Sequence, residues 1–473
     1  MTETTSQRFV RRPLSGWGGT PIEECDVYRP ETVAEFRALV AHAPQATLTP
    51  RGCGRSYGDA ALNGTGAVML SERLNRMVSF DAETGVLRCD AAVTLSNIIE
   101  HFLPIGFFFP VTPGTKNISV GGAIAADVHG KNHNSSGSMS ACVRGFKLLT
   151  GRDEILDCSR VDHPEAFWAT VGGMGLTGVI LEAELQLRSV ESAFVQAENE
   201  RFANLDQLLE RMEDRDAEFE YSVAWVDSLA RGASLGRSVL TRANHASPSA
   251  LSGRLREQPF PDRQHRQHRR HRRRRRRRRL RVPFYLPNAT LNPVSIKVLN
   301  ALFYALHPAS TWIAGCDEFF YTLDAIEDWN RAYGRQGVLQ YQCVIPEAEA
   351  RAGLIALLET FASSGLGSFL TVLKSLGGAS KGLLSFPMPG KTLALDVPNS
   401  GPEVRELFRR LDEIVLQHGG RTYLAKDACM SRETFERMYP RLDEFREAKA
   451  ILDPASRFAS SLSDRLGLTG ASS

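Results

Sequence analysis

The sequence predicts an α+β protein of two to three domains, and three observations support this fold class. At 473 residues the chain is longer than one hydrophobic core usually serves. Helical and strand patterns alternate along it, but without the even rhythm of a doubly wound parallel sheet. From about Ser189 the composition changes, so a second domain is expected to begin there.

The individual elements follow from periodicity and from residues that begin or end helices. Residues 30–40 predict a helix led by proline, because the apolar residues fall on one face. Thr94 is placed to cap a second helix over residues 95–103, which Gly106 closes. Residues 107–111 read as a short apolar strand. In the second half, strands are expected at residues 221–226, 339–345, 368–374 and 392–397, and helices at residues 347–361 and 402–418.

A glycine-rich stretch at residues 50–66 is the strongest local signal. It reads Pro-Arg-Gly-Cys-Gly-Arg-Ser-Tyr-Gly-Asp-Ala-Ala-Leu-Asn-Gly-Thr-Gly and lies between predicted strands at residues 47–49 and 68–70. Successive backbone amides in such a turn form a concavity that suits phosphate oxygens. A P-loop would end in Gly-Lys-Ser or Gly-Lys-Thr and open a helix, which is not the case here. Taken alone, the stretch fits an anion cradle or an ordinary surface turn.

A second stretch of small residues favours the anion cradle. Residues 113–115 are Pro-Gly-Thr, and residues 119–133 read Ser-Val-Gly-Gly-Ala-Ile-Ala-Ala-Asp-Val-His-Gly-Lys-Asn-His. The near absence of side-chain bulk at residues 121–126 allows another backbone or a large planar ligand to lie against them. Residues 173–178 also match Gly-x-Gly-x-x-Gly, but a helix precedes them and a strand follows. A dinucleotide fingerprint has the reverse order, so NAD binding there is rejected.

Together the two stretches resemble the diphosphate loops of the vanillyl-alcohol-oxidase-type flavoproteins, and more closely the decaprenylphosphoryl-β-D-ribose 2′-oxidase family. The closer resemblance rests on motifs at residues 16–18, 51–59, 121–133, 167–173, 329–334, 339–342, 384–387 and 425–427. It implies a PCMH-type FAD-binding domain of two α/β subdomains at residues 1–190. It also implies a substrate domain with an antiparallel sheet and flanking helices at 191–420. Residues 421–473 are then a C-terminal segment that returns to the FAD domain.

The resemblance further implies which residues hold FAD. In this superfamily the residue before the Ser of the first loop is often a His bonded covalently to the flavin, but here it is Arg55. We therefore expect FAD to be bound without a covalent link. The residues expected to bind it are Arg51, Gly52, Cys53, Gly54, Arg55, Ser56, Tyr57, Gly58, Gly114, Ser119, Val120, Gly121, Gly122, Ala126, Asp127, Val128, His129, Ile180 and Tyr423.

Oxidation of a secondary alcohol requires a proton acceptor for the hydroxyl and a hydride acceptor, here the flavin. Lys426 matches the family's active-site lysine, and His129 is the second candidate. Lys426 would either stabilise oxyanion charge or, if burial lowers its pKa, act as a base. A solvated lysine and a structural histidine are the ordinary alternatives. Seven further residues match positions of the family's substrate pocket, namely Lys131, Trp225, Phe320, Gln340, Gln342, Lys374 and Ala394.

Two of these positions depart from the family pattern. Ala394 stands where the mycobacterial enzymes have Cys. Phe320 aligns with a tyrosine of theirs, although Tyr321 follows it and supplies a hydroxyl nearby. The departures concern the lipid and the sugar rather than the flavin reaction.

The net charge of +3 is dominated by one segment. Thirteen arginines lie between Arg263 and Arg281, and without them the formal charge is −10. A run of like charges repels itself, so we expect a disordered loop over about residues 255–282, where family members carry a mobile loop. Such a run can bind anionic lipid or nucleic acid. No nucleic-acid partner is expected, because no aromatic interleaving or DNA-binding motif accompanies it.

The expected cellular compartment follows from two features that the sequence lacks, a membrane span and a secretory signal. No apolar run reaches the ~18 residues of a membrane span, and residues 1–12 lack the apolar core of a secretory signal. The eight cysteines are scattered without metal-like spacing, so no metal is expected and a reducing compartment is indicated. We expect a cytoplasmic protein, and leave peripheral contact with the inner, anionic face of the membrane open.

Three functions remain. The first is FAD-dependent oxidation of the C2′ hydroxyl of a polyprenyl-phosphate-linked ribose, with an NAD(P)H-dependent short-chain reductase as the partner that completes epimerisation to arabinose. The second is a flavin oxidase of a soluble sugar, alditol or aldonolactone. The third is a basic nucleic-acid-binding protein, which would carry no flavin.

Overall fold

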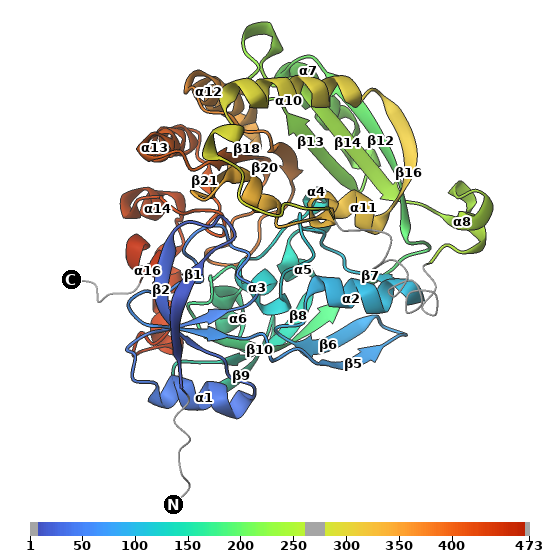
Figure 1. The fold of residues 1–473 in the computed structure, drawn as a ribbon. Helices are drawn as coiled ribbons and strands as arrows, with labels where there is room; N and C mark the ends of the chain where they lie inside the picture. Colours follow the sequence, from blue (N-terminus) through green and yellow to red (C-terminus); the bar gives the residue numbers. More distant parts are fainter. Residues whose placement is uncertain (1–7, 261–279, 469–473) are drawn as a thin grey trace, which may run out of the picture.

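The structure, a computed structural model, describes residues 8–260 and 280–468. Two smaller sheets form its lower half and one large sheet its upper half, with helices packed against both halves (Figure 1). This combination of largely antiparallel sheets and packed helices confirms the predicted α+β class.

The first sheet carries the first glycine-rich loop. Its strand order is β1-β2-β4-β3, with β1 and β2 antiparallel and the other pairs parallel. The loop therefore joins two adjacent strands, as predicted. The elements are β1 (Val10–Ser15), β2 (Ile22–Tyr28), β3 (Leu48–Arg51), β4 (Ala67–Leu70) and the covering helix α1 (Val33–His42).

The second sheet, antiparallel throughout, carries the second loop on its packed face. Its order is β5-β6-β10-β8-β9. The strands are β5 (Met77–Asp81), β6 (Val86–Asp90), β8 (Val143–Leu149), β9 (Ile155–Ser159) and β10 (Val179–Gln186). Apolar side chains of α2 (Leu95–Phe102), α3 (Val120–Ala125), α5 (Met139–Cys142) and α6 (Pro164–Thr170) share one core with it, and the pair β7 (Phe107–Phe108) and β11 (Arg188–Ser189) lies at its edge.

The upper sheet has eight antiparallel strands in the order β16-β12-β14-β13-β19-β20-β18-β21. They are β12 (Phe194–Phe202), β13 (Tyr221–Val226), β14 (Ser238–His245), β16 (Ser310–Gly315), β18 (Val338–Pro346), β19 (Thr371–Leu376), β20 (Gly390–Pro398) and β21 (Arg421–Thr422). One face packs against α7 (Leu205–Arg215), α12 (Ala350–Ser363) and α13 (Pro402–Gln417). The other face turns toward the lower half (Figure 1).

The chain then returns to the lower half through three helices. These are α14 (Arg432–Met438), α15 (Leu442–Leu452) and α16 (Ser461–Leu466). Phe458 forms an isolated bridge with Leu48 of β3, which joins the C-terminal segment to the first sheet. Around the junction lie the short helices α4 (His133–Ser136) and α11 (Cys316–Phe320), and α10 (Pro293–Leu306) crosses the upper sheet.

Several predicted boundaries were wrong, two because of neighbouring residues and one because of a distant residue. The first helix begins at Val33 rather than at Pro30, because Thr32 caps it by accepting a hydrogen bond from the Glu35 amide. The strand predicted at residues 107–111 ends at Phe108, before a proline that cannot donate to a ladder. The strand predicted from Ser368 begins at Thr371, since the Ser368 amide donates to Ser228 Oγ instead (3.2 Å).

The predicted arginine-rich loop was also wrong at its two ends. Residues 253–257 form α8 (Gly253–Glu257), and β15 (Leu280–Arg281) pairs in parallel with β17 (Ile326–Glu327). An ion pair between Arg281 Nε and Asp328 Oδ2 at 2.7 Å supports this pairing. Residues 261–279 lie outside the described residues. Within the described part of the chain, every helix is too short or too polar to cross a bilayer.

Candidate active site

The first loop offers a row of backbone amides. None of the amides from Gly52 to Ser56 donates a hydrogen bond to another described residue. A Cβ added to Gly52 would lie 2.1 Å from Ser119 Oγ, so this loop and the second one touch at a point that requires glycine. Gly114, by contrast, faces open space within 4 Å. Free amides beside an open space fit the diphosphate of FAD.

The two arginines of the first loop have different environments. Arg51 donates to the carbonyl oxygens of Ala61 (2.9 Å) and Ser15 (2.7 Å), so its guanidinium supports the loop from within the protein. The Arg55 guanidinium lies 4.2 Å from the centroid of the Trp17 ring, and its buried Nε has no partner among residues 8–260 and 280–468. Of the two, Arg55 is therefore the side chain with donors left for a ligand.

The second loop forms a short helix rather than an extended run. Ser119 caps α3, and Gly121 packs so closely that an added Cβ would lie 3.0 Å from Ala91 Cβ and 3.7 Å from Ile180 Cβ. Asp127, fully buried, accepts from the Ser140 amide (2.9 Å) and from Ser385 Oγ (2.8 Å). These contacts hold the loop in place and direct the following residues, Val128 and His129, toward the junction of the two halves.

His129 lies among aromatic rings at that junction. Its ring centroid is 5.4 Å from those of Phe386 and Tyr423, and Tyr423 donates its hydroxyl proton to the Ala126 carbonyl (2.7 Å). Gln342 Nε2 lies 3.0 Å from His129 Nε2. An amide nitrogen only donates, so Nε2 accepts and the proton of the neutral ring is on Nδ1. Burial, and then the charge of Lys374, holds the pKa of His129 well below its usual value.

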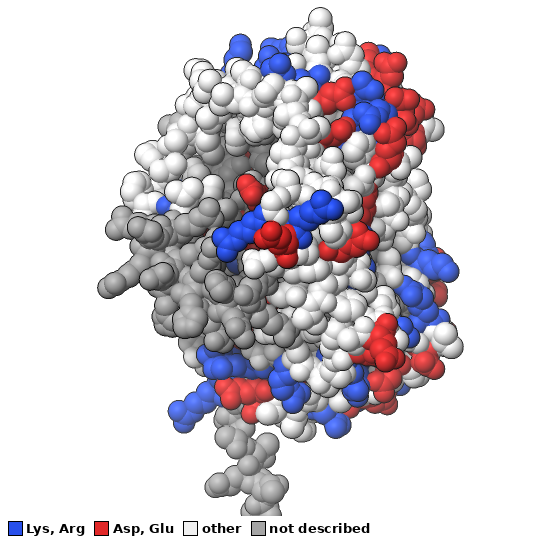
Figure 2. Space-filling view, turned by 90° about the vertical axis from the view of Figure 1, so that its right-hand side faces the viewer, with Lys and Arg blue, Asp and Glu red and all other residues white. Residues whose placement is uncertain are grey.

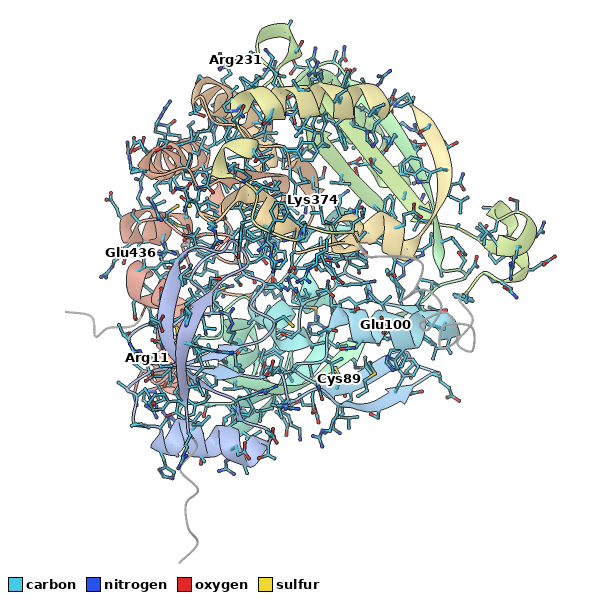
Figure 3. The ribbon with its side chains drawn as sticks, viewed as in Figure 1. Arg11, Cys89, Glu100, Arg231, Lys374 and Glu436 are labelled. Atoms are coloured by element: carbon cyan, nitrogen blue, oxygen red, sulfur yellow. The ribbon has the colours of Figure 1, made fainter. Side chains whose placement is uncertain are left out.

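The substrate-side residues share one face of the upper sheet. Gln342 on β18 stands opposite Ala394 on β20, and Gln340 opposite Asp396. Cross-strand partners point to the same face, and the register of β19 with β20 adds Lys374 to it. Figure 3 shows Lys374 between the upper sheet and the lower half. The sheet therefore presents these side chains to the second loop.

Three lysines from three segments meet on this face. Lys426 Nζ lies 4.2 Å from the centroid of the Tyr57 ring. Burial lowers its pKa to about 8, although the charge of Asp396 acts in the opposite direction. Burial and the charge of Lys426 lower the pKa of Lys374 to about 8, and burial and Lys374 lower that of Lys131 to about 7. The site is cationic, with amines that change charge near neutral pH.

Asp396 is a residue of this site that the sequence did not single out. It is fully buried, Gln340 donates to its Oδ1, and the Tyr57 hydroxyl lies 3.5 Å from its Oδ2. Burial raises its pKa to about 6, against the effect of the Gln340 hydrogen bond and the charge of Lys426. Asp396 is recognised as a site residue only from its pairing with Gln340 across β18 and β20, and no local sequence motif predicts that pairing.

Lys131 is held at the edge of the site by the backbone. Its Nζ donates to the carbonyl oxygens of Phe319 (2.6 Å) and Phe320 (3.4 Å). The Phe320 ring packs into the core, 4.6 Å from the Tyr221 ring. The Tyr321 hydroxyl is buried and has no partner within the described residues. The structure thus places Lys131 at the site. Phe320 contacts Lys131 with its carbonyl oxygen, whereas its ring lies in the core.

Trp225 lies farther along the same sheet face. It stands opposite Val372, the neighbour of Ala394 in the ladder. Its Nε1 donates to the Phe369 carbonyl (2.9 Å), and its ring centroid is 4.5 Å from that of Phe303 in α10. Trp225 therefore connects the lysine-bearing face to α10.

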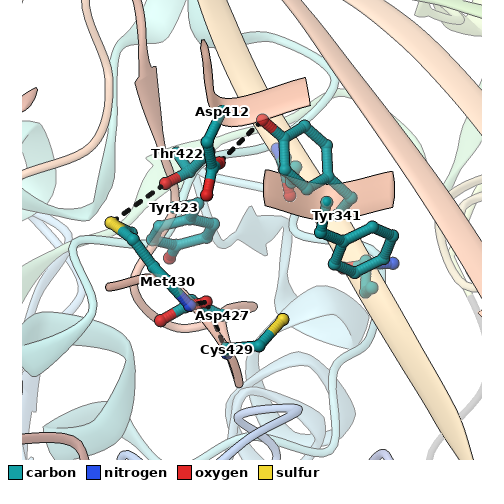
Figure 4. Close-up of a pocket in the computed structure, with 10 residues that line it drawn as sticks. Tyr341, Asp412, Thr422, Tyr423, Asp427, Cys429 and Met430 are labelled. Atoms are coloured by element: carbon teal, nitrogen blue, oxygen red, sulfur yellow. Dashed lines mark hydrogen bonds between the residues drawn. The ribbon is translucent and has the colours of Figure 1, made fainter. Parts of the chain in front are cut away.

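A small pocket lies on the Tyr341 side of β18 and is lined in part by Gln340, Gln342 and Tyr423 of this site (Figure 4). Tyr341 and Asp412 meet there through a hydrogen bond of 2.9 Å. Burial and the charge of Asp427 raise the pKa of Asp412 to about 8. Since Tyr341 alternates with Gln340 and Gln342 along the strand, it faces the helices instead of the lysines.

The loops, the aromatic rings and the lysines define a class, the FAD-dependent oxidoreductases with a PCMH-type FAD-binding domain. Residues 26–159 match the family model for an FAD binding domain, and residues 395–466 match that for D-arabinono-1,4-lactone oxidase. The decaprenylphosphoryl-beta-D-ribose oxidase of Mycolicibacterium smegmatis is 35% identical over 98% of this chain and 99% of its own length. The chain belongs to the decaprenylphosphoryl-β-D-ribose oxidase family.

Two other relatives, one of similar and one of lower identity, were also found. An uncharacterised protein of Streptomyces coelicolor is 36% identical over 80% of this chain and all of its own length. The L-gulonolactone oxidase of Mus musculus is 20% identical over 93% of this chain and 94% of its own length. This sugar-lactone oxidase is thus a more distant relative that aligns with most of the chain. FAD is the cofactor that the family and the loops indicate.

Proposed function

We propose that this protein oxidises the C2′ hydroxyl of a polyprenylphosphoryl-β-D-ribose to the 2′-keto compound, the first half of an epimerisation to the arabinose lipid. One observation carries the proposal beyond family membership. Lys131, Lys374 and Lys426 converge on one sheet face, and among the described residues Asp396 is the one carboxylate whose charge affects their pKa values. An excess of amines suits a substrate with a phosphate rather than a neutral lactone.

Lys426 takes the hydroxyl proton in this proposal. A base works best when its pKa lies near the operating pH, and that of Lys426 is about 8. His129 fits the role less well, because its Nε2 already faces Gln342 and its Nδ1 bears the proton. Its Nδ1, without a partner in the described chain, is free to donate to a bound ligand instead. FAD, when bound, supplies the hydride acceptor.

Lys131 and Lys374 bind the phosphate in this proposal, and Gln340 and Gln342 orient the sugar. Gln342 Nε2 also lies 3.2 Å from Thr392 Oγ1, a second contact that holds the amide beside His129. The 2′-keto product is consumed by a reduction, so the proposal includes an NAD(P)H-dependent short-chain reductase as partner. Because the substrate is lipid-linked, it also includes peripheral contact with a membrane.

A soluble sugar, alditol or aldonolactone is the second candidate substrate. The match of residues 395–466 to the D-arabinono-1,4-lactone oxidase model favours it. The two candidates differ in the phosphate, so they predict different roles for Lys131 and Lys374.

The test is anaerobic titration of the flavin-loaded enzyme with short-chain polyprenylphosphoryl ribose, free ribose and D-arabinono-1,4-lactone. We expect loss of the oxidised-flavin absorbance with the phosphorylated lipid alone, and a product lighter by two hydrogens. Lys131→Gln and Lys374→Gln should raise KM for that substrate by about tenfold or more, since a charge-assisted bond is lost. Bleaching by the lactone but not by the lipid would establish the second candidate.

A further inference from the structure

Among residues 8–260 and 280–468, helix α10 leaves one face exposed. Asn292 caps the helix with a capping box, Pro293 occupies its first turn, and the inner face packs through the buried Ile296 and Asn300. Asn300 donates to Asp227 Oδ1 (2.7 Å), which fixes the rotation of the helix. The opposite face must therefore point away from the protein.

That opposite face is apolar. Val294, Val298, Leu302 and Leu306 follow one another at intervals of four residues and, with Leu299, keep exposed fractions of 38–73%. We call these five side chains the α10 face. The 14 residues of the helix span about 21 Å. In Figure 2 a large uncharged area lies at the upper left, toward the front of Figure 1 where α10 lies.

The sequence around this face is entirely free of acid. No Asp or Glu occurs between Arg263 and Cys316, a segment that contains thirteen arginines and Lys297. The rest of the chain is correspondingly acidic, since the total net charge is only +3. In sequence, the α10 face thus belongs to a strongly cationic segment, and the electrostatic complement of that segment is an anionic surface.

We propose that the α10 face lies on an anionic lipid bilayer and inserts its valines and leucines among the acyl chains. An exposed apolar helix face within a basic segment has the chemistry of an interfacial helix. Phe303 connects the helix to Trp225, on the sheet face that carries Lys374, so a bilayer there adjoins the substrate side of the protein. The inference rests on the proposed function, because a lipid-linked substrate explains why the protein would contact a membrane. Vesicle binding, however, can be measured without that substrate.

A second copy of this chain is the competing occupant of the face. Two such faces in contact would bring together two helices that each carry Lys297 and no acid, which opposes association. Charge complementarity therefore favours the bilayer.

The test is co-sedimentation of the full-length, flavin-loaded protein with vesicles of phosphatidylcholine alone or with 30 mol% phosphatidylglycerol, a composition chosen to be about one-third anionic. We expect binding to the anionic vesicles only. V298S/L302S removes apolar area without changing charge and should weaken the partition coefficient by at least about tenfold. V298E/L302E should abolish binding.

Matched controls come from exposed apolar residues elsewhere. Val161 is 84% exposed and Ile451 66%, both outside α10. The double variants V161S/I451S and V161E/I451E make the same chemical changes and should bind like the wild type. Flavin absorbance and flavin reduction by a short-chain substrate report whether each variant is folded, and α10 variants should retain both.

The outcomes separate the hypotheses. Unchanged vesicle binding by V298S/L302S would overturn the insertion, because adsorption would then depend on charge alone. A concentration-dependent dimer of the wild type that V298S/L302S dissolves, without vesicle binding, would identify the face as a contact between copies and likewise overturn it. Vesicle binding lost in the α10 variants supports the proposal even if polyprenylphosphoryl ribose fails to reduce the flavin, in which case only the proposed substrate is wrong.

Discussion

At the scale of single residues, the proposed function assigns the chemical step to Lys426. Replacing it with alanine removes the base but leaves the cradle at Gly52–Ser56 untouched, so FAD should remain bound while its reduction slows by about 10²–10⁴-fold. Lys426→Arg should recover little, because a guanidinium stays protonated. Anaerobic stopped-flow reduction, with FAD occupancy checked by absorbance, measures both. Reduction of the alanine variant at the wild-type rate would pass the role to His129.

The pH dependence of reduction should follow Lys426 as well. The neutral amine is the reactive form, so the rate should rise with pH and level off above about 8. The negative charge of Asp396 raises the Lys426 pKa, so Asp396→Asn should move the rising limb to lower pH. A profile that is flat from pH 6 to 9, about two units below to one unit above that pKa, would instead indicate a lysine that acts as a cation.

At the scale of elements, the contact between the two loops decides whether FAD is held. The Cβ of Gly52→Ala would lie 2.1 Å from Ser119 Oγ, so either this hydroxyl must rotate away from the α3 cap or one of the two loops must shift. We expect FAD occupancy to fall by about tenfold, with a smaller effect on the melting temperature. Gly315→Ala is the control, because nothing lies within 4 Å of its added Cβ. Full FAD occupancy in the Gly52→Ala variant would show that the loop at Gly52–Ser56 can move without losing FAD.

At the scale of the whole molecule, FAD should leave when the fold is lost. Arg55 occupies the position of the superfamily's linking histidine, and its guanidinium lies over Trp17, 4.2 Å from the ring centroid. Acid precipitation should therefore release all flavin into the supernatant, which fluorescence measures after centrifugation. Yellow colour retained in the washed pellet would reveal a covalent link elsewhere in the chain.

The stability of the fold should depend on pH through Asp412. Its folded pKa, about 8, lies above the usual value of 3.8, so the folded state holds a proton that the unfolded state releases between these values. Stability from this group is therefore complete below about pH 4 and is lost as pH rises toward 8. Asp412→Asn should flatten the decline of melting temperature between pH 5 and 8. An unchanged slope would show that another group titrates.

The sequence alone predicted the parts of this molecule that depend on neighbouring residues. The first loop between two strands, the helix capped by Thr94 and the strand after residues 173–178 were all confirmed. Each is set by local backbone chemistry, such as glycine freedom, capping or alternation. One error arose because a distant group intervened: Ser228 accepts from the Ser368 amide, and β19 begins later than predicted.

The sequence alone thus predicted the class of the protein and identified Lys426 and His129 as candidates, because the motifs consist of consecutive residues. The tertiary structure decided what these residues can do. It paired Gln340 with Asp396, aligned Gln342 with His129 Nε2 and grouped three lysines on one sheet face. Protonation and hydrogen bonding depend on burial and on charges far away in sequence, so only the folded chain shows the environment of each candidate residue.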